Sequence, residues 1–241
     1  MANFMDLSQL AASRAPAPAL PLEIDERELC ERYGCTYTGA INDVLREFML
    51  MNQTLPTTLK PLRPELVLAG VAFTIRSVRD PGVDLDGEMR QRAQLLEAIP
   101  ANAVCVWDTS DDDGAAHWGG MMTAAVKKRG VRGAIVDGGI RDTRQIAAED
   151  FPIFYRFHSS SGMLGRARVV AHQIPVFIGE TMVFPGDIIV ADIDGALVVP
   201  RRIACAVLRR TEQVIGFETD IKRWVDAGNS PSEIVKKGGY F

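Results

Sequence analysis

Two neighbouring stretches of sequence, HWGGMM at residues 117–122 and IVDGGIRD at residues 135–142, decide how this chain folds. The glycine pair of the first stretch interrupts regular structure, and the good helix formers after it predict a helix that begins at Gly119 or Gly120. The short, β-branched and apolar run Val131 to Val136 is typical of a buried strand. Polar side chains then follow together at the end of that strand.

The first backbone amides of the predicted helix have no partner within the helix, and they lie at the positive end of its dipole. The helix start, Gly119, Gly120, Met121 and Met122, is therefore a candidate site for a carboxylate or a phosphate. The alternative is that the glycines only permit a tight turn.

Arg141 and Asp142 are the strongest candidate pair. A guanidinium can hold a carboxylate through two hydrogen bonds, and a carboxylate can hold a hard cation such as Mg²⁺. The alternative is a surface ion pair in which Asp142 caps the next helix. Asp108 ends the preceding buried strand, so if the two strands are neighbours, we expect Asp108, the helix start and Arg141-Asp142 to face one cleft.

Two other polar features have a simpler interpretation as well as a functional one. The run Asp111-Asp112-Asp113 could contribute to a metal site, but we expect a solvated acidic loop. His117 could act as a general base, but the three histidines form no ligand pattern, so a structural histidine is favoured.

Composition and charge exclude several classes of function. With 27 basic and 31 acidic residues the formal net charge is −4, and no basic stripe is present, so we expect no nucleic-acid ligand. No apolar stretch approaches the roughly 20 residues that span a bilayer, and the N-terminus lacks a basic segment followed by an apolar one, so a soluble, cytoplasmic protein without membrane contact is expected. The four cysteines are too scattered for a disulfide framework, and we expect free thiols.

The order of predicted elements favours a layered α/β domain that mixes crossover units with hairpins. Residues 1–22, rich in Ala and Pro, are expected to form an extended arm, and residues 23–241 a single domain. The predicted helices are Glu26 to Tyr33, Thr38 to Met51, Glu88 to Ala98, Thr143 to Ala148 and Arg201 to about Ala227. The predicted strands are Leu66 to Val78, Val104 to Asp108, Pro152 to Tyr155 and a hairpin of Ile188–Ala191 with Ala196–Val199.

The sequence lacks the residues that two kinds of catalytic chemistry need. The six lysines fall in loops or on polar helix faces, which disfavours a Schiff-base enzyme, because such a lysine needs burial to lower its pKa. Neither a dinucleotide-binding glycine motif nor a P-loop is present, so the usual cradles for nucleotide phosphates are missing.

Several segments together resemble the RraA-like family, which includes 4-hydroxy-4-methyl-2-oxoglutarate/4-carboxy-4-hydroxy-2-oxoadipate aldolases and the regulators of ribonuclease E activity A. They are Gly120 followed after twenty residues by Arg141-Asp142, RGVRGAIVDG at residues 129–138, FPIF at residues 151–154, and PGDIIVADIDGALVVP at residues 185–200. The resemblance covers roughly residues 36 to 228. It implies a swivelling β/β/α-type domain with peripheral N- and C-terminal helices, and assembly as a homotrimer or a dimer of trimers.

The resemblance also implies a site between subunits. A pyruvyl carboxylate would bind the amides from Gly120 to Met122, Arg141 would bind substrate, and Asp142 would bind the metal. An acidic residue on the neighbouring subunit's C-terminal helix would hold metal-bound water, and its nearest match is Glu218, with Glu212 as second choice. At two positions the chain departs from the aldolase pattern. The aldolases usually carry Asp where Gly120 stands, whereas the ribonuclease E regulators carry Gly there. An acidic residue is common in the family where Gln145 stands.

The leading functional hypothesis is a lyase that uses Mg²⁺, Mn²⁺ or another divalent cation. It would cleave a 4-hydroxy-2-oxo acid, or decarboxylate oxaloacetate, through an enolate that gives pyruvate, with Arg141 and Asp142 as the catalytic pair. One alternative is a non-catalytic trimer that regulates a ribonuclease-type partner. Another is an RraA-like enzyme acting on a different small acid, because the FHSSS loop at residues 157–161 could line a changed pocket.

Overall fold

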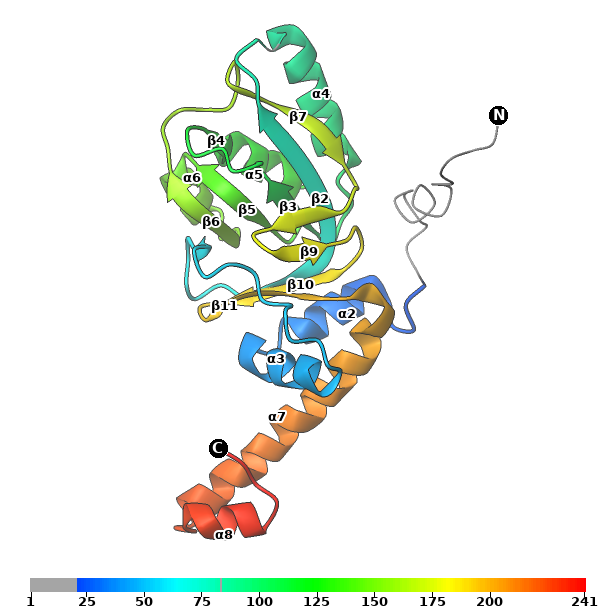
Figure 1. Cartoon of the computed structure of the whole chain (residues 1–241), viewed down its shortest axis with the longest axis vertical. Helices are drawn as coiled ribbons and strands as arrows, with labels where there is room; N and C mark the ends of the chain where they lie inside the picture. The colour runs from blue at the N-terminus through cyan, green and yellow to red at the C-terminus, as the bar shows by residue number, and fades with distance from the viewer. Residues whose placement is uncertain (1–20, 83) are drawn as a thin grey trace, which may run out of the picture.

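Four parallel strands form the centre of the protein in this computed structural model, which describes residues 21–82 and 84–241 (Figure 1). Most of the arm predicted for residues 1–22 lies outside the described residues. The parallel strands follow one another in the order β6-β5-β3-β2 and are joined by helical crossovers, as βαβ units require. They are β2 (Leu68–Arg79), β3 (Ala103–Asp108), β5 (Gly133–Ile140) and β6 (Ile153–His158), with crossover helices α4 (Leu85–Ala98), α5 (Gly120–Lys127) and α6 (Thr143–Ala148).

Antiparallel strands extend this parallel centre at its edges, so the sheet is mixed, as predicted. On one side β10 pairs with β2 and then with β11 in the expected hairpin, while β7 pairs with the far half of β2 after a bulge at Arg76/Ser77. The antiparallel additions are β1 (Lys60–Pro61), β7 (Ala167–His172), β10 (Ile188–Asp192) and β11 (Gly195–Val199). The short strand β4 (Ala116–Trp118) instead pairs in parallel with β5, and β8 (Val176–Ile178) and β9 (Thr181–Val183) form a separate hairpin.

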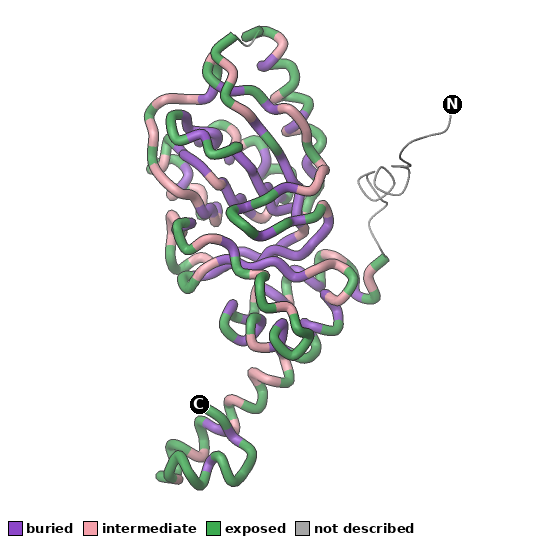
Figure 2. Tube along the Cα trace, viewed as in Figure 1, coloured by how far each residue is buried: buried purple, intermediate pink, exposed green. Residues whose placement is uncertain are grey.

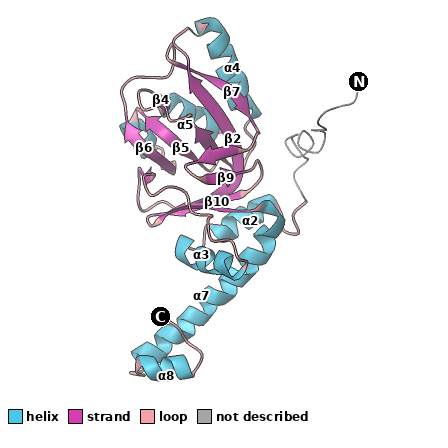
Figure 3. Ribbon diagram, in the orientation of Figure 1, coloured by secondary structure: helices cyan, strands magenta, loops and turns pink. Residues whose placement is uncertain are grey.

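The central strands are apolar on both faces because both faces are covered. In β3, Cys105 and Trp107 belong to the core beneath α4 and α5, whereas Val104 and Val106 belong to the core beneath β8 and β9. Figure 3 shows the helices on one side of these strands and β9 crossing the other. The alternation of side chains along β3 therefore assigns each residue to one of two separate cores.

A second, helical layer packs under β10 and β11 (Figure 1). Its helices α2 and α3 are amphipathic and bury Leu29, Ile41 and Leu45 against α7 and the hairpin. The layer comprises α2 (Glu26–Tyr33), α3 (Thr38–Glu47), the short 3₁₀ helix η1 (Arg201–Ile203), α7 (Ala204–Asp226) and α8 (Pro231–Lys236). The far half of α7 and α8 stand away from the sheet, and Figure 2 shows that most of their residues are exposed.

Most predicted boundaries agree with the structure, and the differences have local causes. Helix α3 ends at Glu47, earlier than the predicted Met51, because Met49 takes a left-handed backbone (φ 61°) that a helix cannot continue through. Helix α4 begins at Leu85, earlier than the predicted Glu88, because the Asp84 carboxylate accepts hydrogen bonds from the amides of Asp86 and Gly87 and caps it.

Among the described residues no helix is both long and apolar enough to cross a membrane.

Candidate functional site

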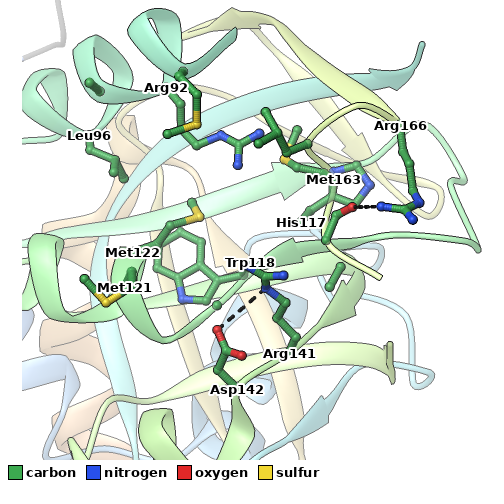
Figure 4. A pocket seen from close by; sticks show the side chains of 16 residues that line it. Arg92, Leu96, His117, Trp118, Met121, Met122, Arg141, Asp142, Met163 and Arg166 are labelled. Atoms are coloured by element: carbon green, nitrogen blue, oxygen red, sulfur yellow. Dashed lines mark hydrogen bonds and ion pairs between the residues drawn. The ribbon is translucent and has the colours of Figure 1, made fainter. Parts of the chain in front are cut away.

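A cavity of about 480 Å³ opens on the face of the sheet that α4 and α5 cover (Figure 4). Its size suits a small organic ligand. The helix start contributes Gly119, Met121 and Met122, and the end of β5 contributes Arg141 and Asp142. The structure thus brings two separate segments of the sequence, the helix start and Arg141-Asp142, to one place.

The backbone fixes where Arg141 and Asp142 lie. The Arg141 amide donates to the Trp118 carbonyl at 3.0 Å, which joins the end of β5 to β4. Arg141 Nε lies 3.6 Å from Asp142 Oδ2, and both side chains are partly exposed, at 48% and 34%. The pair is therefore open to a ligand and only loosely engaged with itself.

Asp142 is the N-cap residue of α6 by position, but its side chain does not cap that helix, so this part of the alternative is wrong, whereas the ion pair with Arg141 is present. Asp142 precedes α6 with a left-handed backbone (φ 57°, ψ 33°), and its side chain makes no capping hydrogen bond to α6. Instead Asp142 Oδ2 accepts a hydrogen bond from the Gly120 amide at 3.1 Å. The carboxylate of Asp142 and the positive end of α5 are thus in direct contact, as helix dipoles favour.

Position 119 needs a glycine because the side chains of Arg141 and Asp142 lie close to it, and not because its backbone is unusual. Its φ of −159° and ψ of 179° are extended and open to any residue. A Cβ at this position would lie 2.8 Å from Asp142 Oδ2 and 3.3 Å from the Arg141 side chain. The interpretation of this glycine as a turn residue is therefore wrong, because the space beside it is filled by Arg141 and Asp142.

Gly120 leaves room for Gln145, which comes from α6. A Cβ at Gly120 would overlap with Gln145 Oε1 and would lie 3.3 Å from the Cβ of Asp142. The amide oxygen of Gln145 therefore stands where a side chain at position 120 would begin. The two departures from the aldolase pattern, Gly120 and Gln145, are neighbours in space and complement each other.

His117 belongs to a buried chain of hydrogen bonds behind the cavity. Trp107 Nε1 donates to Ser77 Oγ at 2.8 Å, Ser77 Oγ lies 2.9 Å from His117 Nδ1, and His117 Nε2 lies 3.1 Å from Asp112 Oδ2. This order makes Ser77 the donor to Nδ1 and places the ring proton of a neutral histidine on Nε2. Burial lowers the pKa of His117, although Asp112 opposes the shift.

Asp112 corrects the prediction of a solvated acidic loop. Its neighbours Asp111 and Asp113 are exposed, but Asp112 itself is buried at 4% exposure. Burial raises the pKa of its carboxyl, but hydrogen bonds from the Gly114 amide and from His117 outweigh it and hold the pKa below its ordinary value. The acidic run thus anchors its loop through one ionised, buried member.

The prediction that Asp108 faces the same cleft is also wrong. The strands β3 and β5 are neighbours, as expected, but Asp108 is paired in register with Asp137 and both line a second cavity of about 950 Å³. Asp108 has the same parity along β3 as Val104 and Val106, so it points to the β8–β9 face of the sheet. Arg141 and Asp142 lie beyond the end of β5 and reach the opposite face.

The second cavity carries charges that are already paired. Arg76 Nε lies 3.4 Å from Asp108 Oδ2, and Arg156 Nη1 lies 3.7 Å from Asp137 Oδ1. Burial raises the pKa of Asp108 and that of Asp137, although these arginines and backbone amides oppose the shift. Across the four neighbouring strands, two adjacent carboxylates, Asp108 and Asp137, are therefore flanked by an arginine on each side.

The two acidic residues suggested for α7 both have partners in their own chain. Glu212 receives two hydrogen bonds from Arg32, at 2.7 and 2.8 Å, which hold the pKa of its carboxyl below the ordinary value. Glu218 accepts hydrogen bonds from the hydroxyls of Tyr37 and Tyr240. A contribution of either residue to a neighbouring subunit's site stays a prediction.

Sequence reasoning missed two cationic residues of the first cavity. Arg92 reaches the cavity from α4, and Arg166 reaches it from the loop before β7. Gly162 and Met163, earlier in the same loop, also line the cavity. The serines of the FHSSS loop do not line the cavity. The spacing of Glu88 and Arg92, four residues apart on one helix face, is the signal that could have identified Arg92.

The sequence profile of the family described as RraA-like, Aldolase/RraA, matches residues 38–198. The chain belongs to the RraA-like family. Solved RraA proteins share its fold, so the predicted layered β/β/α architecture is confirmed.

Individual relatives of this RraA-like chain differ in length and in name. A protein of Halalkalibacterium halodurans named "Putative 4-hydroxy-4-methyl-2-oxoglutarate aldolase" is 30% identical over 161 residues, which is 66% of this chain and 72% of that protein. Protein DlpA of Legionella pneumophila is 27% identical over 174 residues, or 72% of this chain, and the match spans only 28% of DlpA. A solved structure titled "Crystal structure of novel cellulases from microbes associated with the gut ecosystem" is 46% identical, covers 90% of this chain and 96% of that one, and has a TM-score of 0.84.

Proposed function

We propose that this protein is a lyase that uses a divalent cation to cleave a 4-hydroxy-2-oxo acid, or to decarboxylate oxaloacetate, with release of pyruvate. The observation that supports it most is the meeting of Arg141, Asp142 and the start of α5 in one cavity. Carbon–carbon cleavage next to a 2-oxo group develops negative charge on that group, and this cavity offers cationic and amide donors to it.

The residues present fit a hydrated Mg²⁺ or Mn²⁺. Among the described residues no three His, Cys, Asp or Glu side chains cluster as a ready-made metal site. Mg²⁺ nevertheless needs only one or two carboxylates, because it keeps several waters and prefers oxygen ligands. Asp142 would hold it, with the amide oxygen of Gln145 beside the same space. A bound cation would supply Lewis acidity to the 2-oxo group.

The protein's own groups account for binding and orientation of the substrate. The amides of Met121 and Met122, in the first turn of α5, would receive the carboxylate next to the 2-oxo group. Arg141 would face the oxygen on which charge develops, because its guanidinium lies beside Asp142 at the cavity wall. The thioether side chains of Met122 and Met163 would exclude water from that oxygen, and so strengthen both interactions.

A non-catalytic regulator that binds a ribonuclease-type partner is the second candidate. One observation favours it: Gly120 and Gln145 together leave a single carboxylate, Asp142, among the described residues that line the cavity. A third candidate is an RraA-like enzyme for a different small acid. In each case we expect a homotrimer or a dimer of trimers, with Glu218 as the acidic residue offered to a neighbour because Glu212 is held by Arg32.

Glycoside hydrolysis is not favoured by either cavity. That reaction uses two carboxylates on opposite sides of the scissile bond, one of them as a general acid. The cavity at Arg141 has one carboxylate among its described lining residues, and in the second cavity Asp108 and Asp137 stand side by side and are each paired with an arginine.

The test is a pyruvate-release assay over a panel of 4-hydroxy-2-oxo acids and oxaloacetate with Mg²⁺ or Mn²⁺. Arg141→Ala is the control for the site, and a chelator is the control for the cation. We expect release that needs both Arg141 and the cation. If no substrate yields pyruvate and Mg²⁺ does not bind, the regulator is the better description; sugar release from a cellulose oligomer would contradict both.

A further inference from the structure

The first cavity has a cationic end that the proposed chemistry does not use. Arg92, from α4, lines it together with Arg141 and Arg166, against Asp142 as the acidic side chain among the described lining residues. Figure 4 shows Arg92 pointing from α4 into the cavity, on the wall opposite Asp142. A site with more cations than anions suits a ligand that brings more than one negative charge.

Arg92 differs from an ordinary surface arginine. Its side chain is 17% exposed and donates from Nη2 to Glu88 Oε1 at 2.8 Å, and the Glu88 side chain is wholly buried. A helix pair of this spacing usually lies in solvent. Here a buried carboxylate behind Arg92 holds the guanidinium in place at the cavity wall and does not itself line the cavity.

This ion pair does not use all of its hydrogen-bonding capacity. Among the described residues three buried side-chain nitrogen or oxygen atoms lack a partner, and two of them are Arg92 Nε and Glu88 Oε2. Buried polar groups without partners are rare in folded proteins and are often completed by water or by a ligand. The third atom, Gln173 Oε1, belongs to a residue that does not line this cavity.

Arg166 is a weaker candidate for the same role. Its Nη1 already donates to the Gly162 carbonyl at 3.0 Å, in an exposed position. An exposed guanidinium that is bound to its own loop gains little from a further contact, because water competes for it. Arg92 is better shielded from solvent and is fixed from behind by Glu88.

We propose that Arg92, held by Glu88, is the residue that selects the substrate by binding a second carboxylate at the end of the cavity away from Asp142. The cavity would then prefer 2-oxo acids with two carboxylates over those with one. This inference rests on the proposed function in placing the first carboxylate and the 2-oxo group at Asp142, Arg141 and the start of α5. Glu88 is a positioning residue in this arrangement.

The test compares two stable probes, pyruvate with one carboxylate and 2-oxoglutarate with two, by calorimetric titration of the full chain in the presence of Mg²⁺. Arg92→Met should weaken binding of 2-oxoglutarate by about 10- to 100-fold, as for lost hydrogen bonds to a charged group, and change pyruvate binding by less than about threefold. Arg92→Lys, which keeps the charge and is a milder change to the fold, should lose an intermediate amount for 2-oxoglutarate alone.

Arg90→Met is the matched control, because Arg90 lies on the same helix, is exposed and does not line the cavity. It should leave both affinities unchanged. Equal losses for both probes in Arg92→Met and Arg92→Lys, equal losses in Arg90→Met, or wild-type protein that binds both probes alike would overturn the inference.

The same variants distinguish this inference from the proposed function. If 2-oxoglutarate binds through Arg92 but no panel substrate yields pyruvate, the lyase proposal fails and the second carboxylate site stands. If pyruvate is released and Arg92→Met raises KM equally for substrates with one and two carboxylates, the lyase stands and the role of Arg92 fails.

Discussion

Two cavities lie on opposite faces of the same four strands, and they treat charge in opposite ways. On the β8–β9 face, Asp108 and Asp137 are neighbours in register, and each is neutralised by an arginine of an adjoining strand. On the α4–α5 face, Arg141 and Asp142 lie beyond the strand end at a similar separation, 3.6 Å, but the Asp142 side chain is 34% exposed, against 12% for Asp108 and 13% for Asp137. The smaller cavity therefore exposes its carboxylate to a ligand, whereas the larger one holds its two carboxylates mostly buried beside arginines.

The comparison shows that the exposure of a charged side chain depends on its position relative to the strand end more than on the number of charged residues nearby. Within the sheet, Arg76 lies directly across from Asp108 on the neighbouring strand, so these opposite charges can pair. Beyond the strand end, the backbone turns into a helix, and side chains such as Asp142 are aimed at amides and open space. Cavity volume alone would have pointed to the β8–β9 face.

The largest effect is expected from replacing Asp142 of the first cavity, in comparison with Asp137 of the second. Asp142→Asn should lower kcat/KM for pyruvate release by about 10²- to 10³-fold, because a neutral amide neither holds a cation well nor balances Arg141. Asp137→Asn, the matched change on the other face, should stay within about twofold of the wild type. Steady-state kinetics on one panel substrate measures both. Similar losses in the two variants would mean that the cavities do not differ in this way.

The second prediction concerns the buried chain that separates the cavities, since His117 lines the first and Asp112 adjoins Ser110 and Asp111 of the second. His117→Ala should lower the free energy of unfolding by about 2–4 kcal/mol, because Ser77 and Asp112 would lose a buried partner. Urea unfolding followed by fluorescence measures the loss. Removing the exposed ring of His158 is the control and should cost little.

Unfolding of the wild type should also depend on pH through His117. Because burial lowers the folded pKa below about 6.5, the unfolded chain takes up a proton that the folded chain refuses. Stability should therefore be complete above pH of about 6.5 and should fall as the pH drops below it, until the folded pKa is reached. His117→Ala should lack this part of the fall. A slope that is unchanged in the variant would show that His117 is not its source.

The smallest effect is expected when a second carboxylate is added to the first cavity. Gly120→Asp alone should destabilise the fold slightly, because its Cβ would meet Gln145 and force that side chain to move. Combined with Gln145→Ala, it should tighten Mg²⁺ binding by about tenfold through a second carboxylate near Asp142. Titration of Mg²⁺ into the wild type, each single variant and the double variant decides this. No gain in the double variant would mean that Asp142 is not where the cation binds.

The sequence predicted the central architecture well, because local signals agreed with one another there. The helix bounds Glu26–Tyr33 and Thr143–Ala148 and the hairpin at residues 188–199 match the structure, since each is bounded by turn residues and carries a clear period. Strand β4 was missed because Ala116–Trp118 is only three residues long and pairs with β5 across an irregular register.

The site was predicted in part, for reasons that are physical. Residues at one chain turn, such as Arg141 and Asp142, are near in space because they are near in sequence, and the helix start joins them through neighbouring parallel strands. Arg92 could not be placed, because its side chain enters the cavity only through the packing of α4. Asp108 was placed on the wrong face although its parity with Val104 and Val106 was readable from the sequence.

The left-handed backbone of Asp142 bears on which residues position 142 can hold. Glycine there would relieve strain of about 1 kcal/mol and would lose about 0.5–1 kcal/mol through its freer unfolded state, so these two backbone effects nearly cancel. The exchange would also remove the hydrogen bond that the Gly120 amide donates to Asp142, at a cost of about 1 kcal/mol. The contact with the start of α5, and not the backbone conformation, is therefore what a carboxylate at this position adds to the stability of the fold.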